Sequence, residues 1–150
     1  MSVIAWDGLR LAADKRASIG GLIRTTTKVF HLGDALAGYS GDADAGEEVL
    51  AWFRAGADPA KFPAQQRSGD NLAGLLIVHR DGSIWKFERT PHPVRFPAQT
   101  FAIGSGRDFA LAAMHCGRTA PEAVEVACLF DSGCGNGVDV LTFGEGGVQP

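Results

Sequence analysis

Ser2 is the residue nearest the start of the chain whose type and place allow nucleophilic chemistry. Serine is small, so we expect methionine aminopeptidase to remove Met1 and leave a serine with both a hydroxyl and a free amine. An α-amino group titrates at about pH 7.7–8.0 and can act as the base for the hydroxyl of its own residue. The alternative is that Met-Ser is an ordinary start of a chain, without chemical significance.

Lys28 and Asp14 are the charged residues that could support such a nucleophile. If residues 26–32 form a strand, alternation places Lys28 on one face with Phe30 and Leu32. A lysine there either extends to water or is buried against a carboxylate. A buried ammonium lowers the pKa of a neighbouring hydroxyl and helps to move its proton. Asp14 is the candidate partner, and its alternative role is that of an ordinary residue ending a strand.

Gly38 and two Gly/Ser-rich turns are further candidates. Gly38 precedes an expected helix, where a backbone N–H can stabilise an oxyanion during acyl transfer. The alternative is that glycine is needed there only for tight packing. Residues 104–106 and 131–135 could each hold a phosphate. Neither turn has the Gly-Lys-Ser/Thr ending of a P-loop, and neither has the spacing of a nucleophile elbow.

The composition excludes several classes of protein. Fourteen Lys and Arg against 17 Asp and Glu give a net charge of −3, which disfavours nucleic acid as a partner. No apolar run approaches the roughly 20 residues of a membrane span, and the N-terminus lacks the pattern of a signal peptide. The 3 cysteines favour a reducing cytoplasm, and the 4 histidines lack metal-ligand spacing. We therefore expect a cytoplasmic protein without metal or cofactor.

The sequence predicts that hairpins and helices position these residues. The 150 residues fit one domain, 1–150. Expected strands span 3–6, 9–13, 26–32, 35–39, 72–79, 83–87, 101–103 and 138–143, and expected helices span 41–55, 104–117 and 119–130. Residues 15–25, 57–71 and 88–100 are expected to be connections. Asp7-Gly8 between the first two strands is a hairpin signal, and Thr119-Ala120-Pro121-Glu122 is a capping box that opens the last helix. Hairpins imply antiparallel sheets, and amphipathic helices need a sheet face to cover, so two facing sheets with helices outside accommodate this order.

Five segments together resemble proteasome β-type subunits, most closely the bacterial HslV-like and the stand-alone bacterial or phage forms. They occur in family order over nearly the whole chain: Asp7-Gly8-Leu9-Arg10-Leu11-Ala12-Ala13-Asp14-Lys15-Arg16-Ala17-Ser18, Lys28-Val29-Phe30, Ala37-Gly38-Tyr39-Ser40-Gly41-Asp42-Ala43, Ile103-Gly104-Ser105-Gly106 and Asp131-Ser132-Gly133-Cys134-Gly135. The resemblance implies an α+β fold, the four-layer αββα sandwich of N-terminal-nucleophile hydrolases.

The resemblance also implies roles for individual residues. Ser2 would be the nucleophile, with its own amine as base. The other implied catalytic roles are a charged pair of Asp14 and Lys28, an oxyanion N–H from Gly38, and Ser105 and Asp131 orienting the amine. Cys134 stands where the family has serine, and Ser2 where it has threonine. Serine lacks the methyl group that restricts rotation, so slower proteolysis is expected.

The resemblance places Leu36 and Ser40 in substrate binding. Leu36 precedes Gly38 by two residues, so alternation puts its side chain on the face that Gly38 presents. It would then form an apolar pocket for the residue before the scissile bond, favouring leucine, tyrosine or phenylalanine there. The alternative is that Leu36 belongs only to the core.

The predicted function is that of a self-compartmentalising peptidase built as stacked homo-oligomeric rings. Its substrates would be peptides or unfolded proteins, and the family pattern leaves room for an AAA+ unfoldase as a partner. Two alternatives stay open at this point. One is a non-catalytic ring that keeps Met1 and serves as a scaffold, and the other is a small-molecule amidase on the same fold.

Overall fold

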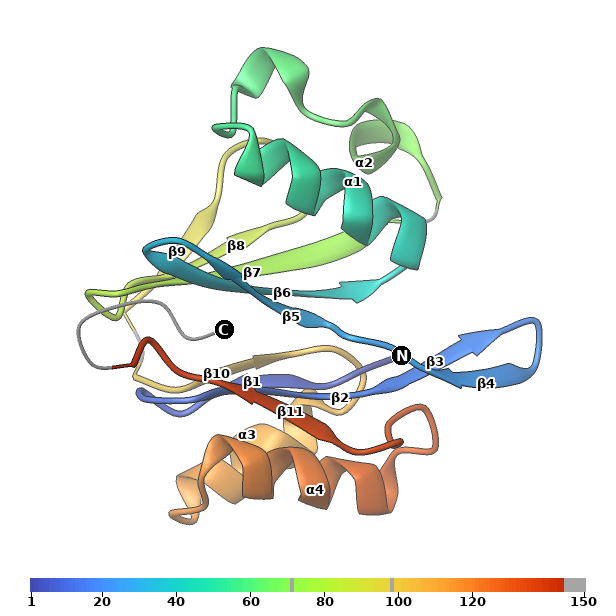
Figure 1. Ribbon diagram of the computed structural model, residues 1–150, viewed down its shortest axis with the longest axis vertical. Helices are drawn as coiled ribbons and strands as arrows, with labels where there is room; N and C mark the ends of the chain where they lie inside the picture. Colours follow the sequence, from blue (N-terminus) through green and yellow to red (C-terminus); the bar gives the residue numbers. More distant parts are fainter. Residues whose placement is uncertain (71, 98, 145–150) are drawn as a thin grey trace.

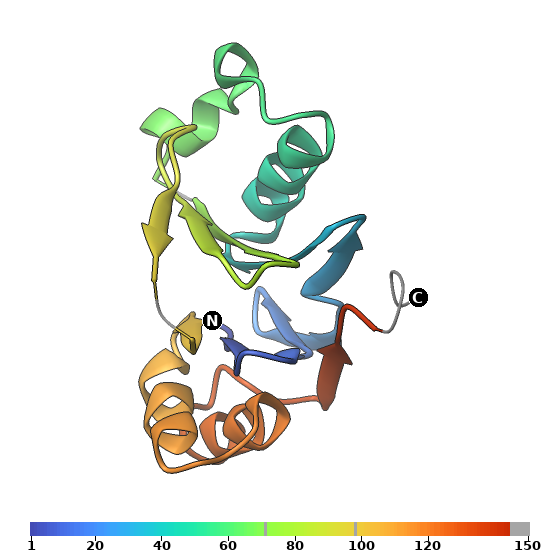
Figure 2. The ribbon, with the colours of Figure 1, turned by 90° about the vertical axis from the view of Figure 1, so that its left-hand side faces the viewer.

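The computed structural model describes residues 1–70, 72–97 and 99–144, and its elements form four layers. Two antiparallel sheets face each other, and helices cover the outer face of each (Figure 1). Turned by 90°, the molecule shows α1 (Ala43–Arg54) above one sheet, and α3 (Arg107–His115) and α4 (Ala120–Phe130) below the other (Figure 2). The α+β four-layer arrangement expected from the sequence is confirmed.

The first sheet has the strand order β10-β1-β2-β11, and all of its neighbours are antiparallel. Its strands are β1 (Ile4–Trp6), β2 (Leu11–Asp14), β10 (Phe101–Ile103) and β11 (Val138–Leu141). The β1–β2 hairpin around Asp7-Gly8 thus forms as the sequence indicates. Because β1 lies between β2 and β10, the N-terminus is fixed in the middle of the sheet.

The second sheet has the strand order β5-β6-β7-β8-β9. Its strands are β5 (Val29–Leu32), β6 (Ala35–Gly41), β7 (Ala73–His79), β8 (Ile84–Phe87) and β9 (Val94–Phe96). Its helix is α1 (Ala43–Arg54), and η1 (Pro59–Lys61) and α2 (Ala64–Ser68) follow in the connection to β7. The short elements η1 and α2 fall in 57–71 and β9 falls in 88–100, so the expectation of loops throughout these two stretches was wrong.

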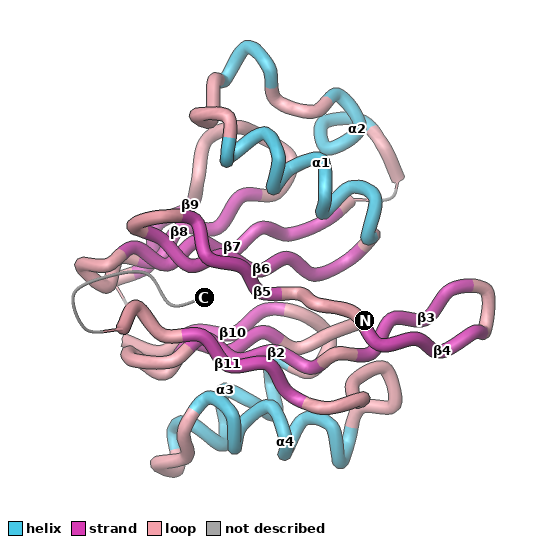
Figure 3. The backbone as a smooth tube through the Cα atoms, viewed as in Figure 1, coloured by secondary structure: helices cyan, strands magenta, loops and turns pink. Residues whose placement is uncertain are grey.

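A separate two-stranded hairpin extends from one end of the sandwich (Figures 1 and 3). It consists of β3 (Arg16–Ile19) and β4 (Leu22–Thr25), and it lies in the polar stretch expected to be a connection. Ile19, Leu22 and Ile23 are at least half exposed on it. The sequence prediction missed the hairpin because its apolar residues face no core of this chain.

The alternation of β1 explains how the layers pack. Ile4 and Trp6 point between the sheets, whereas Val3 and Ala5 pack against α3 (Arg107–His115) and α4 (Ala120–Phe130). Fully burying each large apolar side chain contributes about 1.5–3 kcal/mol. The capping box predicted at Thr119 is confirmed. Glu122 N donates to Thr119 Oγ1, and the Glu122 carboxylate accepts from Thr119 N, so α4 begins where the sequence indicates.

Candidate active site

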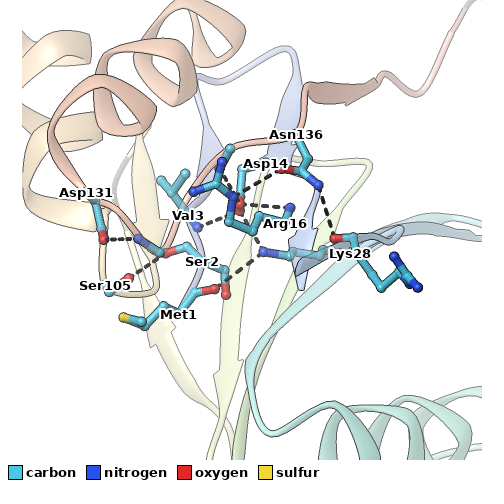
Figure 4. Close-up of polar contacts among 12 residues, drawn as sticks. Met1, Ser2, Val3, Asp14, Arg16, Lys28, Ser105, Asp131 and Asn136 are labelled. Carbon is cyan, nitrogen blue, oxygen red and sulfur yellow. Dashed lines mark hydrogen bonds and ion pairs between the residues drawn. The ribbon is translucent and has the colours of Figure 1, made fainter. Parts of the chain in front are cut away.

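Ser2 lies almost entirely inside the protein, between β1 and the turn after β10 (Figure 4). Its backbone carbonyl accepts a hydrogen bond of 3.0 Å from Gly106 N, and the Ser105 hydroxyl lies 3.4 Å away. Next along the chain, Val3 N donates to Asp14 Oδ1 at 3.1 Å and Asp14 N donates to Val3 O at 3.2 Å. Ser2 is therefore held in place by main-chain hydrogen bonds of Ser2 itself and of Val3.

A buried ion pair lies beside Ser2. Lys28 Nζ is 2.8 Å from Asp14 Oδ1, and the two side chains are 7% and 0% exposed. Asp14 also accepts hydrogen bonds from Arg16 N at 3.2 Å and Gly135 N at 3.0 Å, in addition to Val3 N. Of the two alternatives for Lys28, the structure shows the buried one. Because the carboxylate accepts several donors, its charge is well compensated inside the protein.

The direction of Lys28 differs from the expected one. Lys28 precedes β5, so the alternation of that strand does not apply to it. Phe30 and Leu32 pack on the side of α1, whereas the ammonium of Lys28 extends to Asp14 in the other sheet. The expectation of a common face was therefore wrong. The same ammonium lies 3.5 Å from the carbonyl oxygen of Met1, which places it at the peptide bond joining Met1 to Ser2.

Ser105 and Asp131 approach Ser2 from another side (Figure 4). Ser105 follows β10, and Asp131 ends α4. Hydrogen bonds from the Ser105 hydroxyl and from Gly133 N, the latter at 2.8 Å, hold the pKa of Asp131 below its ordinary value. Asp131 is therefore a stable carboxylate, suited to bind an ammonium at the chain end.

Cys134 is buried next to this carboxylate. Burial, followed by the charges of Asp14 and Asp131, raises the pKa of its thiol to about 12. Burial also raises the pKa of Cys128. Since the thiolate is the reactive form, neither cysteine is a nucleophile near neutral pH. Cys134 instead hydrogen bonds to Asp131, which is a role that a serine hydroxyl would also fill.

Gly38 lies in β6, opposite Val29 and Leu76. A Cβ there would lie 3.0 Å from Ile4 Cγ2 and 3.2 Å from the carbonyl oxygen of Lys28, so glycine lets the strand approach both. Tyr39 N donates to the carbonyl oxygen of Lys28 on the β5 side. Successive N–H groups of a strand alternate in direction, so that of Gly38 points toward β7. For Gly38 to stabilise an oxyanion, this N–H would have to give up its pairing with β7.

Leu36 and Ser40, the two residues predicted to bind substrate, lie in β6 on either side of Gly38 along the chain. Leu36 is fully buried and packs between the sheets with Ile4 and Leu76. Ser40 is half-buried near the end of the strand, opposite Gly74. Leu36 therefore forms part of the core. An open cleft of about 520 Å³ lies between the β1–β2 and β7–β8 turns, and none of the predicted site residues lines it.

Two residues near the site were not predicted, Arg16 and Asn136. Arg16 Nη1 donates to Ser132 O at 2.8 Å, and Arg16 Nε donates to Asn136 Oδ1 at 3.1 Å. Asn136 Nδ2 in turn donates to Thr25 Oγ1 at 3.1 Å. These bonds connect the β3–β4 hairpin to the loop that carries Gly133 and Cys134. The sequence offered a reason to consider Arg16, because this residue lies within the first of the five segments that resemble the family.

Other kinds of site receive no support from the part of the chain that the structure describes. It contains no group of three or more His, Cys, Asp or Glu side chains arranged to hold a metal ion. Among the described helices, none combines the length and the apolar character that crossing a membrane requires.

Comparison with solved structures identifies the fold. HslV from Trypanosoma brucei superposes with a TM-score of 0.70 at 18% identity, covering 93% of this chain and 96% of that one. The fold is that of HslV-like proteasome β-type subunits. BPH from Thiobacillus denitrificans, in complex with epoxomicin, has a TM-score of 0.68 at 20% identity and covers 100% of both chains. A further structure of BPH from Thiobacillus denitrificans gives a TM-score of 0.65 at 20% identity, covering 99% of this chain and 98% of that one.

The sequence itself carries little of this similarity. No protein-family model matches it, and the search of curated proteins finds no significant match. At 18–20% identity the solved structures establish the fold alone.

Proposed function

We propose that this chain is a single-domain peptidase of the HslV-like fold, with Ser2 as nucleophile once Met1 is removed. The observation that carries the proposal is the buried Lys28–Asp14 pair, whose ammonium lies 3.5 Å from the carbonyl that Met1 contributes to the Met1–Ser2 peptide bond. A further support is the solved complex of a BPH of the same fold with epoxomicin.

The reaction would proceed through an ester. The Ser2 hydroxyl attacks the peptide carbonyl and passes its proton to the Ser2 amine, while Lys28 stabilises negative charge on the attacking oxygen. The tetrahedral intermediate collapses, the C–N bond breaks, and the amine returns the proton to the leaving nitrogen. Water then attacks the ester and loses a proton to the amine. The C–O bond to Ser2 breaks, the amine returns the proton to the Ser2 oxygen, and the acid leaves. Ser105 and Asp131 hold the amine in place throughout.

The assembly would be a stack of homo-oligomeric rings enclosing the sites, with peptides or unfolded proteins as substrates and an AAA+ unfoldase feeding it. Exposed apolar side chains support an assembly. Ile19, Leu22 and Ile23 lie on the isolated hairpin, and Leu129 and Phe130 at the end of α4 are 78% and 68% exposed. Contiguous exposed apolar surface marks interaction sites.

We place the protein in the cytoplasm, because its cysteines are free.

One observation favours a second candidate, a non-catalytic ring. Met1 fits the site in the structure: its carbonyl oxygen faces Lys28 and its side chain packs on Gly133. If Met1 is kept, the amine is blocked, and the protein would serve as a chamber or scaffold only.

Hydrolysis of fluorogenic peptides by wild-type protein, Ser2→Ala and Ser2→Thr tests the proposal. We expect wild-type activity, none for Ser2→Ala, and faster turnover for Ser2→Thr, because the threonine methyl restricts rotation of the nucleophile. Light scattering of the same samples should show oligomers. Equal activity of Ser2→Ala and wild type would contradict the nucleophile, and a clean monomer would contradict the compartment.

A further inference from the structure

The side chain of Met1 packs against Gly133 beside Ser2. A Cβ added to Gly133 would overlap Met1 Cβ, and it would lie 2.9 Å from Met1 Sδ and 3.1 Å from Met1 Cγ. Gly133 does not have a left-handed φ, so its backbone conformation would accept other residues. Glycine at this position therefore leaves space for a side chain, and the side chain that fills the space is that of Met1.

The space becomes available once Met1 has gone. The reaction proposed above, on which this inference rests, requires the Ser2 amine to give a proton to the leaving nitrogen. That nitrogen must come within about 2.6–3.2 Å of the amine. Removal of Met1 also frees the side of the amine to which the carbonyl carbon of Met1 was bonded, so this side is open to the leaving nitrogen. The residue that carries the leaving nitrogen then lies where Met1 lay.

We propose that Gly133 forms a shallow subsite for the side chain that follows the scissile bond, with preference for an unbranched apolar residue such as methionine. Met1 is 70% exposed, so the recess is open on one side. The side chain of Met1 extends toward Ser105 and Asp131 (Figure 4). An acidic residue there would face the Asp131 carboxylate, so glutamate is disfavoured at this position of the substrate.

Internally quenched peptides that differ only in the residue after the scissile bond test the proposal. Methionine, glycine and glutamate are compared with wild-type protein, Gly133→Ala and Ser132→Ala. The side chain of Ser132 is exposed in the same loop, so Ser132→Ala is the matched control. We expect wild type and Ser132→Ala to prefer methionine. In Gly133→Ala, the ratio of kcat/KM for methionine over glycine should fall about tenfold, because the new methyl group occupies the place of the substrate Cβ.

Covalent labelling by epoxomicin separates this inference from the proposed function. A peptide epoxyketone carries no residue on the leaving side, so all three proteins should be labelled at similar rates if they are folded and have a working nucleophile. An unchanged methionine-to-glycine ratio in a Gly133→Ala protein that is still labelled would overturn the subsite. A wild-type protein that is neither labelled nor active on any peptide would overturn the proposed function and this inference with it.

Discussion

The two sides of Ser2 are built differently. On one side, Asp14 and Lys28 form an ion pair with 0% and 7% exposed side chains, and the carboxylate is fixed by main-chain N–H groups from three segments. On the other side, Asp131 is half-buried and accepts hydrogen bonds from Ser105, Gly133 and Cys134. A rigid, dry charge suits the task of polarising a hydroxyl, whereas a more accessible carboxylate suits an amine that must gain and lose protons. Under the proposed mechanism, the first side would set the reactivity of Ser2 and the second would set its pH dependence.

Removing Lys28 should have the largest effect. Lys28→Ala leaves the Asp14 carboxylate buried without its partner, which costs about 3–5 kcal/mol of folding free energy, and it removes the positive charge at the nucleophile. We expect no detectable peptidase activity together with a lowered Tm, measured by peptide hydrolysis and thermal unfolding.

The double variant Asp14→Asn with Lys28→Met distinguishes chemistry from stability. It removes both charges, so most of the lost stability should return while the activity stays absent. Recovered activity in this variant would show that the lysine is needed only for folding.

Asp14→Asn alone should have a smaller effect on activity than Lys28→Ala. The amide keeps an acceptor oxygen for Val3 N, but it no longer holds the ammonium by charge. We expect kcat/KM to fall about a hundredfold with little change in KM. A large rise in KM with an unchanged kcat would instead place Asp14 in substrate binding.

Asp131→Asn should change the pH dependence more than the maximal rate. Because the folded pKa of Asp131 is lowered, its carboxylate contributes stability above its unfolded pKa of about 3.9 and loses it as the pH falls through the folded value. Near neutral pH it is ionised, and under the proposed mechanism it holds the protonated Ser2 amine by charge. In Asp131→Asn the amine should lose its proton at lower pH, so the acid limb of the rate profile moves to lower pH. An acid limb at the same pH in both proteins would contradict the role of Asp131.

Cys134→Ser should have the smallest effect. The thiol has a pKa of about 12, so it acts only as a hydrogen-bond donor to Asp131, and a hydroxyl can replace it. We expect kcat/KM within about threefold of wild type, and no loss of wild-type activity on treatment with iodoacetamide at pH 7. Inactivation that Cys134→Ser prevents would show that this thiol is reactive.

The elements that carry the candidate site could be predicted in large part from the sequence, because their patterns are local. Hairpin turns such as Asp7-Gly8 and the capping box at Thr119 depend on neighbouring residues, and they placed β1, β2 and α4 correctly. The direction of Lys28 could not be derived in this way. It depends on where β5 begins, and that is decided by pairing with β6.

The features that the sequence did not reveal depend on contacts between distant segments. Arg16 binds Ser132 and Asn136, more than a hundred residues away along the chain, and no local pattern predicts such bonds. The exposed β3–β4 hairpin has no core-facing periodicity, so its strands could not be recognised. Leu36 satisfied the pattern of both a pocket residue and a core residue, and only its full burial separates the two.

Intact mass of the purified protein, before and after incubation with epoxomicin, tests the central claim most directly. We predict a starting mass that lacks Met1, and then complete conversion to a single adduct that peptide mapping locates on Ser2 and that Ser2→Ala does not form. A protein that keeps Met1 and gains no mass would contradict the account and would leave the non-catalytic ring.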